Sequence, residues 1–172
     1  VQAVNDPVEE NYDALMFAGM LAGIGFGNAG CHLPHGMSYA VAGLVKDYAP
    51  EGWPTDHNMV PHGISVIVNS PAVFRKTGPV CAERHWQVAA AMGADLTDTK
   101  VEDGGDILAD QILGMMRETG IPNGLSGVGY SMDDLDALTD GSYVQKRLID
   151  NGPMPISRDE LKGLFSDAMS YW

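Results

Sequence analysis

The sequence predicts an all-α, multi-helix domain, and three observations support this. Apolar residues recur at helical spacing in several segments, Gly and Pro separate these segments, and only residues 64–68 alternate as a strand would. A lone short strand has no partner, so residues 64–68 are expected to be helical as well. The 172 residues, 45% hydrophobic and 19% charged, suit one domain with a substantial core. We expect six or seven helices in a single domain over residues 1–172.

Capping residues predict where the first helices begin. Asp6 is placed to cap a helix that starts at Pro7 and runs into the low twenties, and Glu9 stands at the capping-box spacing. Pro34 fits the first turn of a second helix, which is expected to run to Val45. A loop rich in Pro and Gly then follows.

The second half of the chain predicts four further helices. A short helix is expected over residues 86–92 and a longer one over residues 105–119, each ending at a Gly. Another begins at Ser131. The clearest begins at Ser157, which opens an S-x-x-E capping box, and apolar residues follow at helical spacing as far as Trp172.

Charge and cysteine content exclude several classes of protein. The 23 acidic and 10 basic residues give a net charge of −13, which repels nucleic acids and anionic membranes. Cys31 and Cys81 make neither a disulfide framework nor a CxxC metal site, so a reducing compartment such as the cytoplasm is expected. The chain begins at Val1, without a basic leader, so we expect no signal peptide and interpret the chain as a fragment or a processed product.

Residues 14–45 contain no Asp, Glu, Lys or Arg, which raises the alternative of a membrane span. Against a span, the segment contains Asn28, several histidines and many glycines, and no basic cluster flanks it. We therefore expect a deeply buried helical hairpin and no membrane insertion. Within it, residues 25–30 match the dinucleotide motif GxGxxG, but no strand precedes them, so we interpret them as part of a helix rather than as a cofactor loop.

Four of the five histidines lie between His32 and His62, and two of them have nearly the same neighbours. His35 stands in LPHGMS and His62 in VPHGIS, each in a Pro-His-Gly turn ahead of a predicted helix. A helix N-terminus disfavours the imidazolium form, so each ring stays available as a ligand for Zn, Fe or Ni. The alternative is that these histidines are core or capping residues, hydrogen-bonded to backbone carbonyls.

The blocks GFGNAGCHLPHGMSYAVAG and VPHGISVIVNSPAVF, followed by ERH, GAD and VGYS, resemble a known family. Over residues 15–172 the chain is similar to the C-terminal helical domain of the iron-containing (group III) alcohol dehydrogenases, within the dehydroquinate synthase-like superfamily. It is most similar to their hydroxyacid-oxoacid transhydrogenase branch. The resemblance implies a metal-binding helical domain whose partner, an N-terminal nucleotide-binding domain, is absent from this chain.

The resemblance also implies the site. Fe²⁺ or Zn²⁺ is held in this family by one Asp and three His, of which two fall on His35 and His62. The other two ligands, and most contacts to NAD, belong to the missing domain. Many members carry a further His where this chain has Tyr39, so Tyr39 supports the transhydrogenase branch and is a candidate to position substrate or water. His32 is a candidate to support the ligands from behind.

The implied reaction is hydride transfer from a small hydroxy acid or alcohol, with 4-hydroxybutyrate as donor and 2-oxoglutarate as oxo-acid acceptor in the transhydrogenase branch. Arg75 and Arg84 are the candidates to bind a substrate carboxylate, unless the missing domain supplies that group. The face that carries the site is expected to be apolar and exposed, and the protein to form a homo-oligomer. If the protein is eukaryotic, the mitochondrial matrix is expected.

A second hypothesis is a free-standing, non-catalytic helical binding or assembly module with structural histidines. A reading frame that continues upstream into alternating strands and helices would favour the enzyme.

Overall fold

The computed structural model describes residues 1–54 and 56–172. This part of the chain contains nine α-helices and three short 3₁₀ helices, and no β-strand. The all-α prediction is therefore confirmed, including the helical interpretation of residues 64–67. In chain order the elements are α1 (Gln2–Asn5), α2 (Glu9–Ala29), α3 (Leu33–Gly43), α4 (His62–Ile67), α5 (Ser70–Ala91), η1 (Val101–Asp103), α6 (Gly104–Glu118), η2 (Ser126–Val128), η3 (Met132–Asp134), α7 (Leu135–Tyr143), α8 (Lys146–Ile149) and α9 (Arg158–Asp167).

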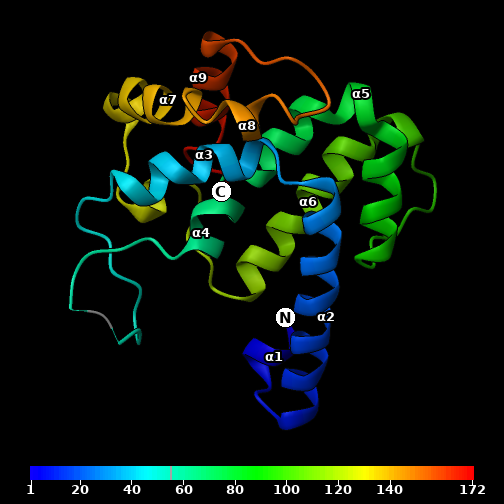
Figure 1. Ribbon diagram of the computed structural model, residues 1–172. Helices are drawn as coiled ribbons and strands as arrows, with labels where there is room; N and C mark the ends of the chain where they lie inside the picture. Colours follow the sequence, from blue (N-terminus) through cyan, green and yellow to red (C-terminus); the bar gives the residue numbers. More distant parts are fainter. Residues whose placement is uncertain (55) are drawn as a thin grey trace.

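The core lies between two groups of helices. Helices α5 and α6 pack along each other, while α3 is bordered by α4, α7 and α8 (Figure 1). Helix α9 contacts both α5 and α7, and so joins the two groups. The core side chains come from most of these elements and include Leu33, Met37, Leu108, Met116, Leu138 and Phe165. This packing fixes α3, which carries most of the candidate site residues.

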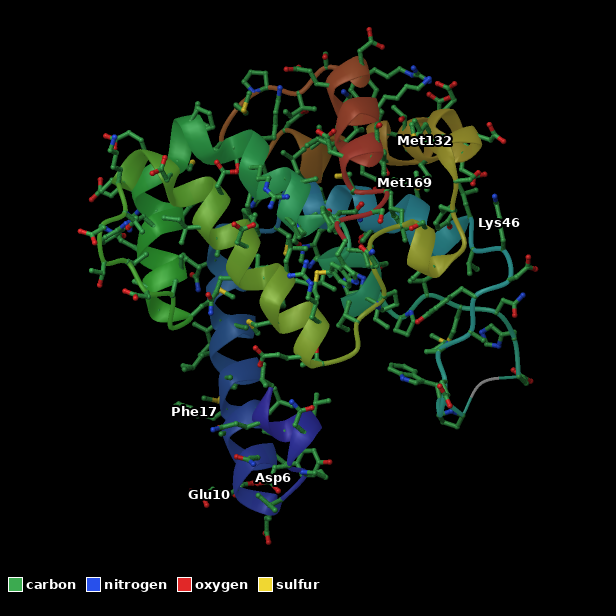
Figure 2. The ribbon with its side chains drawn as sticks, turned by 180° about the vertical axis from the view of Figure 1, so that it is seen from behind. Asp6, Glu10, Phe17, Lys46, Met132 and Met169 are labelled. Carbon is green, nitrogen blue, oxygen red and sulfur yellow. The ribbon has the colours of Figure 1, made fainter. Side chains whose placement is uncertain are left out.

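Helix α2 extends away from the rest of the molecule and has no buried residue (Figure 1). Figure 2 shows Phe17 on the side of α2 that faces away from α1. The exposed apolar side chains of the helix are Tyr12, Leu15, Met16, Phe17, Met20, Leu21, Ile24 and Phe26. The buried hairpin expected for residues 14–45 is thus wrong for its first helix and right for α3. A lack of charge indicates that a segment prefers apolar surroundings, but not that the same stretch of chain provides them.

The glycine-rich segment of residues 25–30 is helical up to Ala29, as expected, and ends at Gly30, whose φ is +74°. In the described part of the chain no single helix is both long and apolar enough to cross a membrane. Helices α2 and α3 pass that test of length and composition only as a pair, and they are bent by 107° with respect to each other.

Three predicted boundaries are wrong. Asp6 does not cap the first long helix, because the chain forms the short α1 and α2 then starts with Val8 as its N-cap. The helix expected over residues 86–92 is the end of the much longer α5, which continues past Pro79 by bending at Cys81, where φ is −132°. The last helix ends at Asp167, before the predicted Trp172.

The other predicted helices are present, but the described residues form nine α-helices rather than six or seven, and α8 was not predicted. Helix α6 lies within one residue of the predicted range, and the segment that starts at Ser131 continues through η3 into α7. The capping box at Ser157 is present in full, since its Oγ accepts from the backbone N–H of Glu160 and the Glu160 carboxylate accepts from the backbone N–H of Ser157. The S-x-x-E capping box therefore predicted the start of α9 correctly.

Candidate metal and substrate site

The repeated Pro-His-Gly sequence produces the same local structure twice. His35 lies in the first turn of α3 and His62 begins α4, and in each helix the Ser three residues later donates a 2.8 Å hydrogen bond to the histidine's carbonyl oxygen. These donors are Ser38 and Ser65. Because α3 packs on α4, the two helix N-termini bring their imidazoles together.

The rings of His35 and His62 lie 5.3 Å apart between centroids, with an angle of 60° between their planes. Two imidazoles that bind one tetrahedral metal have centroids about 5 Å apart, given a metal–nitrogen distance of about 2.0–2.1 Å. Partial burial, and then the neighbouring His62, lower the pKa of His35 below its ordinary value of 6.5. A neutral ring is what metal binding needs, so this pair fits two ligands of a metal site.

A hollow of about 220 Å³ opens beside this pair, and we call it the histidine hollow. Its lining residues are Phe26, Gly30, Cys31, His35, Tyr39, His62, Arg147 and Leu148. Tyr39 stands one helical turn after His35 and is 49% exposed, so it is not a core residue. The structure thus brings the predicted Tyr39 to the same hollow as both predicted ligands.

His32, the N-cap residue of α3, lines an adjacent hollow of about 260 Å³ together with His35 and Phe74. Its ring meets Phe74 edge to face, with 6.2 Å between centroids, and its buried Nδ1 has no hydrogen-bond partner among the described residues. Burial, followed by His35 and His85, lowers the pKa of His32. His32 therefore shares a hollow with His35, and its role in supporting the ligands stays a prediction.

The sequence interpretation missed His85, which is far from the other histidines along the chain. Its buried ring packs edge to face with Phe74, which also contacts His32, and 5.3 Å separate the centroids of His85 and Phe74. Its Nε2 lies 3.4 Å from the Thr77 hydroxyl, and its burial lowers its pKa. Phe74 and His85 are eleven residues apart, about three helical turns, but the Gly-Pro pair between them conceals in the sequence the helix that carries both.

Several other charged residues do not line the histidine hollow. Arg75, a candidate for binding carboxylates, pairs with Asp106 and Asp110, and Arg84 bonds to a neighbouring glutamine on the surface of α5. Neither residue lines the histidine hollow, and their role in substrate binding stays a prediction. Asp56 and His57 pair with each other, with 2.8 Å between Oδ1 and Nδ1, in the exposed connection between α3 and α4. Within the described residues, no group of three or more His, Cys, Asp or Glu side chains is arranged to hold a metal.

We expect the 172-residue chain alone to bind Zn²⁺ weakly. It brings two neutral nitrogens together, so a dissociation constant of about 1 μM or weaker is expected, unless His32, Asp56 or His57 moves in as a substitute ligand. Binding should weaken as the pH falls, because protonation of His35, whose pKa is lowered by burial and by His62, competes with the metal. Zinc titration calorimetry of the chain and of His35→Ala tests this. Nanomolar binding that survives the substitution would contradict it.

Comparison with known proteins places the chain in a family. The family model described as "Fe-containing alcohol dehydrogenase family, C-terminal" matches residues 1–169. The hydroxyacid-oxoacid transhydrogenase of Xenopus laevis is 44% identical and that of Homo sapiens 41%, each over 99% of this chain but only 37% of the relative. A probable transhydrogenase of Dictyostelium discoideum is 43% identical over 92% of this chain and 29% of its own length. The chain thus spans between 29% and 37% of the length of these relatives.

Solved structures show the same fold at lower identity. A 1,3-propanediol oxidoreductase superposes with a TM-score of 0.74 at 23% identity, covering 88% of this chain and 36% of that one. An alcohol dehydrogenase from Oenococcus oeni gives a TM-score of 0.74 at 19% identity, covering 87% of this chain and 35% of that one. With a family model that covers almost every residue, the chain belongs to the Fe-containing alcohol dehydrogenase family and corresponds to its C-terminal region.

Proposed function

We propose that this chain is the metal-binding C-terminal domain of an NAD-dependent hydroxyacid-oxoacid transhydrogenase. The single observation that carries the proposal is the pairing of His35 and His62 at the spacing of two metal ligands. The names and the 41–44% identity of the curated relatives support the reaction class. In this reaction the hydroxy acid loses a proton from its oxygen and a hydride from the adjoining carbon, and the oxo acid gains both.

His35 and His62 would hold the metal, which is Fe²⁺ or Zn²⁺. When bound, such a metal supplies a Lewis acid toward the substrate oxygen. His32 lines the adjacent hollow together with His35, and there it would help to hold that ring in position. Tyr39 reaches the same hollow and would position the substrate or a water molecule near the reacting oxygen.

The remaining ligands and most NAD contacts would come from an N-terminal nucleotide-binding domain, in agreement with the greater length of the relatives. The uncovered apolar surface of α2 supports a large partner surface of this kind. We further propose that the protein forms a homo-oligomer, because exposed apolar surface at a domain boundary favours association between copies. We propose the cytoplasm as its location, or the mitochondrial matrix in a eukaryote, as the names of the relatives suggest.

The test uses the full-length protein that contains this chain. Incubation with 4-hydroxybutyrate deuterated at C4 and with 2-oxoglutarate should give deuterated 2-hydroxyglutarate. Treatment with a chelator should abolish this transfer, and added Fe²⁺ or Zn²⁺ should restore it, because the two histidines hold the group that activates the substrate oxygen. The 172-residue chain alone is the negative control and should be inactive. Undiminished transfer by protein shown to be metal-free would overturn the proposal.

A further inference from the structure

A basic residue lies in the histidine hollow, and the sequence interpretation did not single it out. Arg147, on the short helix α8, lines the hollow together with His35, Tyr39 and His62. None of its other lining residues is Lys, Arg or an acid. In a chain of net charge −13, Arg147 gives this hollow a local positive charge, which favours an anionic ligand.

Contacts with α3 and with the chain between α2 and α3 fix the position of α8 beside the histidines. Leu148 and Ile149, which directly follow Arg147, are buried, and a Cβ built on Gly36 would lie only 2.7 Å from the Ile149 side chain. Gly36 is the neighbour of His35, so α8 touches α3 at the metal-binding turn. After α8, the Asn151 side-chain amide donates to the backbone carbonyls of Ala29 and Cys31, at 3.2 and 3.1 Å.

Arg147 is also free to bind an anion. Most basic residues of the chain already have partners, such as Lys46 with Asp134, Lys76 with Glu160 and Arg158 with Asp140. The neighbouring Lys146 lies over the Tyr143 ring, 3.4 Å from its centroid. Arg147 has no ion pair or hydrogen bond to any described residue, and its side chain is exposed. A planar guanidinium of this kind binds a carboxylate through two parallel hydrogen bonds.

We propose that Arg147 binds the carboxylate of the hydroxy-acid or oxo-acid substrate, at the far end from the reacting oxygen, and so selects acids over neutral alcohols. This rests on the proposed function, because it assumes that the substrate oxygen lies at His35 and His62. Arg147 acts in recognition and not in the chemical step, so its loss affects KM for acids more than kcat.

The test compares the charged substrate with a neutral analogue of nearly the same shape. In the metal-loaded, full-length protein, Arg147→Gln should raise KM for 4-hydroxybutyrate about 10- to 100-fold, the range for a lost charged hydrogen bond, and leave KM for 4-hydroxybutyramide within about twofold. The KM of Arg147→Lys for 4-hydroxybutyrate should lie between that of the unsubstituted protein and that of Arg147→Gln. Lys146→Gln removes the same charge one residue away, outside the hollow, and should leave both KM values unchanged.

A second measurement separates this proposal from the reaction itself. Calorimetry with butyrate, which cannot react, should show binding to the unsubstituted protein and loss of at least about tenfold in affinity in Arg147→Gln. If the protein oxidises neither substrate but binds butyrate through Arg147, the proposed reaction fails and the carboxylate site stands. If it oxidises 4-hydroxybutyrate and Arg147→Gln changes neither KM nor butyrate affinity, or raises KM for NAD instead, the Arg147 proposal is overturned alone.

Discussion

Replacing both His35 and His62 by Ala in the full-length protein is expected to remove the bound metal and to lower kcat/KM for a hydroxy acid by at least about 1,000-fold. Lewis-acid activation of a substrate oxygen contributes several kcal/mol, and each 1.36 kcal/mol corresponds to a factor of ten. Metal content by elemental analysis and turnover should fall together, since the same two nitrogens would serve both.

The helical fold should survive this double substitution. Both rings border a solvent-accessible hollow rather than the core, so their loss opens no internal cavity. Circular dichroism should therefore be unchanged. His57→Ala is the matched control, because His57 lies on the exposed connection and does not line the hollow, and it should keep both metal and activity. A double variant with stoichiometric metal and normal turnover would show that the two histidines are structural.

The fold was predictable where the signal was local. The capping box at Ser157 and the apolar stripe of α6 depend on residues three or four positions apart, and both were predicted correctly. The continuity of α5 was not predictable, because a Gly-Pro pair normally stops a helix. There, α5 bends at Cys81 and packs against α6.

The candidate site was predictable to a similar degree. The two Pro-His-Gly sequences indicated His35 and His62, and both histidines lie in the first turn of a helix, where the Ser three residues later bonds to the histidine carbonyl. His85 and Arg147 were missed, because each reaches the site through the packing of helices far apart in the sequence. Such tertiary proximity leaves no local pattern. The burial of α2 was wrongly expected for a related reason. The hydropathy of a segment does not show which other segment or partner covers its apolar surface.

Substituting the glycine pair at the start of α6 is expected to destabilise the domain more than any single change at the site. A Cβ on Gly104 would lie 2.2 Å from the Ala82 carbonyl oxygen, and one on Gly105 would lie 2.6 Å from the Gly78 Cα. These neighbours are backbone atoms of α5, so relief of the clash requires the two helices to separate.

Gly105→Ala should therefore cost at least about 1–3 kcal/mol in the free energy of unfolding, the usual range for overpacking, and Gly104→Ala should cost more because its contact is closer. Urea unfolding of the 172-residue chain measures both. Gly114→Ala on the same helix is the control, since its Cβ would meet no atom within 4 Å, and it should stabilise the chain by about 0.5–1 kcal/mol through higher helix propensity. Because α5 also carries Phe74 and His85, separation of α5 from α6 should loosen the packing behind His32. Equal stability of all three variants would show that α5 and α6 do not pack this closely.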